Sequence, residues 1–132
     1  MPPLPPLRIL LVEDNLINQK VASRMLEKQG HTVVIANNGK EALAMLAVQN
    51  FDAVVMDVQM PEMDGLEATA AIRAGEQGTG RRLPILALTA HAFAGDRERC
   101  FQAGMDGYVA KPVQSAQLLA ALAEVIGLAR PA

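Results

Sequence analysis

The hydrophobic positions of the chain fall into short apolar runs that alternate with longer stretches of helical period. The runs are rich in Val, Ile and Leu and show little polar alternation, as is typical of parallel strands covered on both faces. Strands are expected at residues 8–12, 32–36, 52–56, 84–88 and 106–110. Helices are expected at about residues 16–29, 39–49, 65–74, 93–103 and 115–127. This regular alternation predicts an α/β fold with a parallel sheet, right-handed crossovers and helices on both faces.

Residues that begin or end helices stand where this pattern needs them. Asn38, with Glu41 three residues later, resembles a capping box at the start of the second helix. Gly30 and Gly104 follow the first and fourth helices, where glycine commonly takes the left-handed turn that ends a helix. The polar, Gly-rich stretch at residues 74–82 predicts a surface connection before the fourth strand.

The chain is expected to hold a single domain at residues 8–128, preceded by a Pro-rich linker at 1–7 and followed by a short tail at 129–132. A length of 132 residues suffices for one packed core. No apolar run approaches the ~20 residues that span a bilayer, and the start lacks the basic and apolar regions of a signal peptide. Because Cys100 is the only cysteine, no intramolecular disulfide can form. These features favour a cytoplasmic location.

Composition argues against a nucleic-acid partner. The formal net charge is −2, so there is no overall surplus of basic residues to contact phosphates. Aromatic residues make up 3% of the chain, which leaves few platforms for base stacking.

Polar residues recur at the ends of the expected strands. Glu13 and Asp14 follow the first strand, Asp57 the third, Thr89 the fourth, and Lys111 the fifth. In an open parallel α/β sheet, ligands bind beyond the carboxyl ends of the strands. We therefore expect these side chains to gather at one edge of the sheet.

Three carboxylates that are brought together repel one another unless a cation intervenes. Hard oxygen ligands favour Mg²⁺, which often bridges carboxylates and a phosphate. An aspartate can attack phosphorus to give an aspartyl phosphate, and a lysine supplies a mobile positive charge for the phosphoryl group. The combination predicts Mg²⁺-dependent phosphoryl chemistry, in which one carboxylate attacks while the others hold the metal.

Four segments carry a resemblance: LVEDN at residues 11–15, VMDVQMPEMDG at 55–65, LTA at 88–90 and GYVAKP at 107–112. Their order and approximate spacing are similar to those of the receiver domain of two-component response regulators. The likeness covers residues 8–127. It implies a single flavodoxin-like (βα)5 domain with a five-stranded parallel sheet of order 2-1-3-4-5.

The resemblance also implies roles for the acidic residues and their neighbours. Asp57 would be the phosphoacceptor, which receives its phosphoryl group from a phosphohistidine. Asp14 and Asp57 would bind Mg²⁺ through their side chains, Gln59 through its backbone carbonyl, and Glu13 through a coordinated water.

Three further positions take their roles from the same resemblance. Lys111 would pair with the phosphoryl group, and its bond to Pro112 would be a cis peptide. Thr89 would move to hydrogen-bond a phosphoryl oxygen, and Tyr108 would turn inward behind it as a switch. The modification adds nearly two negative charges, for which a hydroxyl, a metal and an ammonium are suitable partners.

A finer resemblance concerns the type of receiver. The segments EDN at residues 13–15, NQ at 18–19, LTAH at 88–91 and GDRERC at 95–100 are similar to receivers of hybrid sensor histidine kinases. Such a receiver, the cytoplasmic part of a larger sensor, exchanges phosphoryl groups with a histidine kinase core or a histidine phosphotransfer domain. A stand-alone single-domain response regulator is the alternative.

The first helix offers a candidate contact surface for such a partner. Helical period places Val21, Ala22, Met25 and Leu26 on the buried side, with Asn18 on the same axis. Leu16 and Ile17 fall off this stripe and are expected to be exposed beside the active site. They are either partner contacts or ordinary scattered surface apolar residues.

Two other functional classes compete with a phosphoryl-accepting module. An aspartyl-phosphate phosphatase or phosphotransferase usually needs a second acid two residues after the nucleophile, and here that position is Gln59. We therefore expect no true enzyme, only slow self-dephosphorylation. A flavin or dinucleotide domain is disfavoured because no Gly-x-Gly-x-x-Gly motif follows the first strand.

Overall fold

A computed structural model describes residues 5–58, 63–90 and 94–129, with the backbone alone for 94–96 and 128–129. Within these residues, one parallel sheet of five strands runs in the order β2-β1-β3-β4-β5. The strands are β1 Arg8–Val12, β2 Thr32–Ala36, β3 Ala53–Asp57, β4 Ile85–Thr89 and β5 Gly107–Ala110. The expected parallel α/β fold and its strand order are confirmed.

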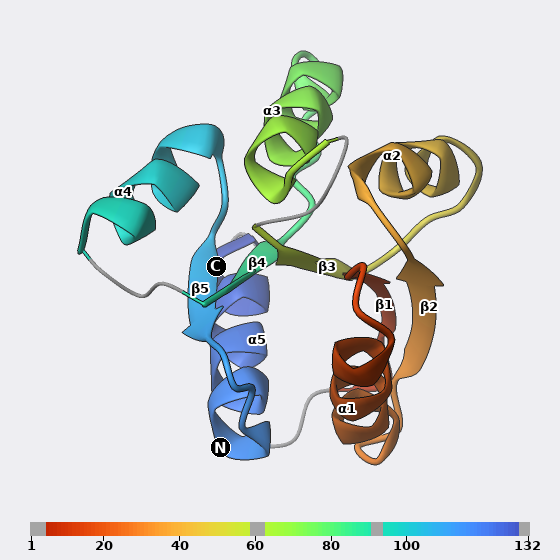
Figure 1. Ribbon diagram of the computed structural model, residues 1–132. Coiled ribbons are helices and arrows are strands. Elements are labelled where there is room, and N and C mark those ends of the chain that lie inside the picture. Colours follow the sequence, from red (N-terminus) through yellow and green to blue (C-terminus); the bar gives the residue numbers. More distant parts are fainter. Residues whose placement is uncertain (1–4, 59–62, 91–93, 130–132) are drawn as a thin grey trace.

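Each strand is followed by a helix. The helices are α1 Leu16–Glu27, α2 Gly39–Val48, α3 Gly65–Glu76, α4 Ala94–Ala103 and α5 Ser115–Ala129. Figure 1 shows that α1 and α5 cover one face of the sheet, while α2, α3 and α4 cover the other. None of the helices in the described part of the chain is long and apolar enough to cross a membrane.

Local signals account for several helix boundaries. Gly30 and Gly104 have φ values of 94° and 110°, so both take the expected left-handed turn after a helix. The Asn38 side chain caps α2 by accepting from the Glu41 N–H. The Glu41 carboxylate, however, accepts from the Asn37 backbone rather than from Asn38, so the predicted capping box is shifted by one residue on that side.

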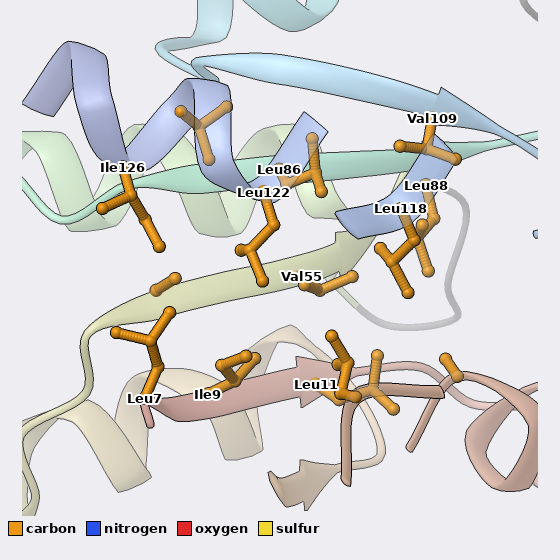
Figure 2. Close-up of a cluster of buried hydrophobic side chains, with 14 residues drawn as sticks. Leu7, Ile9, Leu11, Val55, Leu86, Leu88, Val109, Leu118, Leu122 and Ile126 are labelled. Carbon is orange, nitrogen blue, oxygen red and sulfur yellow. The ribbon is translucent and has the colours of Figure 1, made fainter. Parts of the chain in front are cut away.

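Alternate residues of each strand point to opposite faces, which gives two layers of core. One layer lies under α1 and α5, and Figure 2 shows its side chains from β1, β3, β4 and β5 meeting those of α5. The other layer lies under α2, α3 and α4 and includes Cys100, which is buried as a packing residue. Burial of the sheet on both faces explains why its strands are continuous apolar runs.

The buried side of α1 differs from the expected stripe. Its buried residues are Gln19, Ala22 and Leu26, whereas Val21 is 42% exposed. The prediction for Val21 was wrong because the helix is rotated toward Gln19, a polar residue and therefore no part of an apolar stripe. Leu16 and Ile17 are exposed, as predicted.

One groove in the described part of the chain is remote from the polar strand ends. It has a volume of about 710 Å³ and opens at the amino-terminal edge of the sheet, where Leu7, Asp52 and Pro84 precede strands. None of the candidate site residues lines it.

Candidate functional site

The carboxyl ends of the central strands bring the predicted polar residues together. Asp57 is the last residue of β3 and Thr89 is the last of β4, each one residue inside a strand that was expected to end just before it. Glu13 continues the sheet beyond β1, since its N–H donates to the Ala36 carbonyl at 3.0 Å. The Lys111 N–H donates to the Thr89 carbonyl at 2.8 Å and holds the end of β5 against β4.

Three carboxylates form the centre of the site. Glu13, Asp14 and Asp57 each offer an oxygen, and these oxygens all lie within 4.8 Å of one another. Glu13 and Asp57 are almost completely buried, at 1% and 3% exposure, whereas Asp14 is exposed. The site therefore has two buried carboxylates and one exposed carboxylate.

Lys111 connects the two buried acids. Its ammonium lies 3.0 Å from Asp57 Oδ2 and 3.3 Å from Glu13 Oε2, and its side chain is 20% exposed. One lysine therefore offsets part of the charge of three acids, and the cluster keeps an excess of negative charge.

This crowding is reflected in the pKa values of the cluster. Burial raises the pKa of the Glu13 carboxyl above its ordinary value, and the negative charge of Asp57 raises it further. Burial alone would lower the pKa of Lys111, but its hydrogen bond to Asp57 and the charges of Asp57 and Glu13 outweigh that effect and raise it. The lysine is thus held firmly in its charged form.

The donor set fits a hard divalent cation. Glu13 Oε2 is buried and, among the described residues, has no hydrogen-bond partner beyond its ion pair with Lys111. A buried carboxylate oxygen that lacks a hydrogen bond is costly and favours a further cation. Carboxylate oxygens are also the ligands that Mg²⁺ prefers. The acidic cluster is therefore suited to a metal such as Mg²⁺.

A glycine allows the start of α3 to lie directly against the backbone of Asp57. A Cβ atom on Gly65, at the start of α3, would lie 2.3 Å from the carbonyl oxygen of Asp57 and 3.0 Å from Val58 Cα. Gly65 also donates its N–H to the Val58 carbonyl at 2.9 Å. Any side chain at position 65 would displace the backbone that carries Asp57.

The remaining predicted residues lie along β4 and β5. Thr89 is buried at the end of β4, and Tyr108 is half-buried in β5. The Arg97 guanidinium carbon lies 4.7 Å from the centroid of the Tyr108 ring, a cation–π distance. The Lys111–Pro112 peptide is cis, as the resemblance implied. Gln59 lies outside the described residues.

Three buried polar residues escaped prediction: Gln19, His31 and Thr69, the last of which is fully buried on α3. Gln19 is buried beside Glu13. The feature that could have indicated its burial is its spacing of three residues from Ala22 and seven from Leu26, which places all three on one face of the helix. His31 is buried, and its Nδ1 accepts from the Leu7 N–H at 3.1 Å. Nothing in the sequence around His31 distinguishes it from an exposed loop residue.

Comparison with known proteins identifies the family. Residues 9–123 match the response regulator receiver domain. The chain belongs to this family. The receiver is 43% identical over 113 residues to hybrid signal transduction histidine kinase I of Dictyostelium discoideum. The aligned region covers 82% of this chain and 6% of that kinase. The chain spans 6–14% of the length of the curated relatives that it matches.

Two solved structures place the receiver among close structural relatives. The receiver domain of sensor histidine kinase PA1611 from Pseudomonas aeruginosa, with a magnesium ion coordinated in its active site cleft, has a TM-score of 0.82. It is 47% identical, over 93% of this chain and 99% of that one. The receiver domain of Ssk1 from Saccharomyces cerevisiae, in a co-crystal structure with the histidine phosphotransfer protein Ypd1, has a TM-score of 0.84. That match is 30% identical and covers 96% of this chain and 93% of that one. The chain is thus a two-component receiver domain homologous to receivers of histidine kinases.

Proposed function

We propose that Asp57 accepts a phosphoryl group from a phosphohistidine and so relays or switches a two-component signal, as part of a hybrid histidine kinase. The observation that carries this proposal is the placement of a buried Asp57, 3.0 Å from the Lys111 ammonium, within a cluster of three carboxylates. Membership of the receiver family and the histidine kinase relatives support the same role.

In the transfer step, an Asp57 carboxylate oxygen attacks phosphorus and forms an O–P bond. The P–N bond to the donor imidazole breaks, and its electron pair returns to the ring nitrogen. Such a step is accelerated mainly by positioning and by charge, because the protein makes few covalent contributions. The ends of β3 and β5 provide that positioning for Asp57 and Lys111.

Lys111 and Thr89 are the residues that stabilise the product. The Lys111 ammonium passes from its resting carboxylate partners to an oxygen of the phosphoryl group, to which it offers up to three donors. The Thr89 hydroxyl moves to donate to a second phosphoryl oxygen, and Tyr108 turns inward behind it. Two charge-assisted contacts then hold a new arrangement of the surface.

Mg²⁺ is the cation that we assign to the acidic cluster, where it would supply positive charge to offset that of the phosphoryl oxygens. Asp14 and Asp57 would hold it through their side chains, with Gln59 contributing its carbonyl and Glu13 a water contact. The 4.8 Å limit on the separation of the three carboxylate oxygens supports this assignment.

We also propose that the domain does not turn over as an enzyme. The sequence has Gln59 rather than an acid two residues after Asp57, so no carboxylate at that position can activate water. The expected outcome is one slow hydrolysis of the domain's own aspartyl phosphate.

The test is to incubate the protein with acetyl phosphate and Mg²⁺ and to follow its intact mass. We expect one added phosphate on the wild type, and none on Asp57→Asn or when EDTA removes the metal. Rapid release of inorganic phosphate over many turnovers would favour a phosphatase instead. An unchanged mass of the wild type in every condition would overturn the proposal.

The partner surface that we propose lies on α1. Leu16 and Ile17 are 68% and 71% exposed, and Val21 extends the same apolar patch one turn further. The patch follows directly on Asn15 and the acidic cluster, so a partner seated on it would bring its phosphohistidine close to Asp57. The Ypd1 complex of a related receiver supports a histidine phosphotransfer domain as the kind of partner.

Alanine at Ile17 tests this surface. Ile17→Ala would remove about 1–2 kcal/mol of the free energy gained by burying apolar surface on docking. With a phosphohistidine domain as donor, this corresponds to a phosphotransfer efficiency about 5–30-fold lower. Val48→Ala is the matched control, because Val48 is 79% exposed at the far end of α2. Equal rates for the two variants would exclude Ile17 from the contact surface.

A further inference from the structure

Gln19 is a buried polar residue on the helix that begins beside the acidic cluster. It is 5% exposed and lies on the buried side of α1 together with Ala22 and Leu26. Its Nε2 donates to the Glu13 carbonyl at 2.6 Å and to Asn37 Oδ1 at 2.9 Å. Both amide protons are therefore used, and neither partner is a neighbour of Gln19 in sequence.

These hydrogen bonds fix the main chain at Glu13 from two sides. The Glu13 N–H donates to the Ala36 carbonyl at 3.0 Å, and the Glu13 carbonyl accepts from Gln19. That carbonyl belongs to the planar peptide group that joins Glu13 to Asp14. The direction of this peptide group sets how both acidic side chains project into the site.

The second partner of Gln19 is itself anchored. The backbone N–H and the Nδ2 group of Asn37 both donate to Glu41 Oε1, each at 3.1 Å. On the other side, the Gln19 N–H donates to the Asn15 carbonyl at 2.9 Å within the first turn of α1. The carboxamide thus sits at a junction between the start of α1, the end of β1 and the segment between β2 and α2.

We propose that Gln19 is a positioning residue for the metal site: its carboxamide holds the Glu13–Asp14 peptide so that both carboxylates face the cation. The inference rests on the Mg²⁺ site of the proposed function. Gln19 touches neither the cation nor the phosphoryl group, and it acts through the main chain of the two acids.

Gln19→Met is the variant that separates this role from simple packing. Methionine keeps the length and apolar body of the side chain and adds no charge, but it removes both donors. Loss of an outer contact that orients metal ligands commonly weakens metal binding about 10–100-fold, and we expect a weakening of that order here. Gln29→Met is the matched control, because Gln29 is exposed just beyond α1.

The experiment is a calorimetric titration of the wild type, Gln19→Met and Gln29→Met with MgCl2, with thermal unfolding of each in EDTA. Phosphorylation by acetyl phosphate is measured in parallel over a range of Mg²⁺ concentrations. We expect Gln19→Met to need about 10–100-fold more Mg²⁺ for half-maximal phosphorylation, with a wild-type rate once Mg²⁺ is saturating. A purely structural role would lower the rate at every Mg²⁺ concentration.

The outcomes separate this inference from the proposed function. An unchanged Mg²⁺ affinity of Gln19→Met, in a wild type that binds Mg²⁺ and is phosphorylated, would overturn the positioning role alone. A rate that excess Mg²⁺ does not restore would overturn it as well. A wild type without Mg²⁺ affinity would overturn the metal site and this inference together. Should Gln19→Met not fold, Gln19→Asn, which keeps the amide one methylene short of Glu13, is judged by the same criteria.

Discussion

Removing the lysine that connects the two buried acids should destabilise the domain in the absence of metal. In Lys111→Met, the carboxylates of Glu13 and Asp57 lose an ammonium that lies 3.3 Å and 3.0 Å away. At an effective dielectric constant of about 20, each contact corresponds to ~5 kcal/mol of gross Coulomb attraction. Most of this is offset by the cost of removing the charges from water.

Breaking a buried ion pair costs about 3–5 kcal/mol, since the remaining charge is left without compensation. The Lys111 side chain is 20% exposed, so solvent screens part of the attraction. We therefore expect the free energy of unfolding to fall by ~2–4 kcal/mol relative to the wild type. Urea denaturation in EDTA at pH 7.5 measures this difference.

Two further variants make the result interpretable. Lys20→Met is the control, because Lys20 is an exposed residue of α1 and should change stability by less than ~0.5 kcal/mol. Adding Glu13→Gln to Lys111→Met should recover much of the loss, since one of the two uncompensated charges is then removed. The reasoning would be refuted if Lys111→Met unfolded at the same urea concentration as the wild type.

Three further perturbations probe the same account. In EDTA, the raised pKa of Glu13 means that the folded state binds this proton more tightly than the unfolded state, so stability rises as pH falls from neutral toward the unfolded pKa of 4.5. Urea denaturation across pH should show that Glu13→Gln lacks this gain. Parallel pH profiles of the two proteins would contradict the prediction. Burial lowers the pKa of His31 below its ordinary value of 6.5, so the wild type should lose stability as pH falls through 6.5 toward the folded pKa. The variant His31→Gln should lack this loss. An equal loss in both proteins would exclude His31 as its source. Gly65→Ala places a Cβ 2.3 Å from the Asp57 carbonyl oxygen, and a displacement of about 1 Å at a reacting group costs ~100-fold in rate. Acetyl phosphate should therefore phosphorylate this variant ~100-fold more slowly than the wild type. A wild-type rate would show that the backbone adapts to the added methyl group.

The fold was predictable because its strongest signal is periodicity over the whole chain. Apolar runs without polar alternation indicated strands buried on both faces, and the structure has helices on both faces of the sheet. The ends of elements were less certain, since Asp57 and Thr89 proved to be the last residues of their strands. A boundary error of one residue did not matter, because both side chains still face the carboxyl edge.

The buried side of α1 was not predictable in the same way. The apolar positions of the helical period include Val21, which is exposed, but not Gln19, which is buried. Only tertiary partners explain this rotation, because Gln19 is held by Glu13 and by Asn37 from a different strand end. His31 was missed for the same reason, since its Nδ1 accepts a hydrogen bond from the backbone N–H of Leu7, which is distant in sequence.

The central claim is that the carboxylate of Asp57 becomes an acyl phosphate, and locating the modified residue tests it most directly. The protein is treated with acetyl phosphate and Mg²⁺, reduced with borohydride, which converts an acyl phosphate to an alcohol, and mapped by peptide mass spectrometry. The account predicts homoserine in place of Asp57 and unmodified Glu13 and Asp14. Reduction at another acid, or none at Asp57 in protein whose mass has increased, would contradict it.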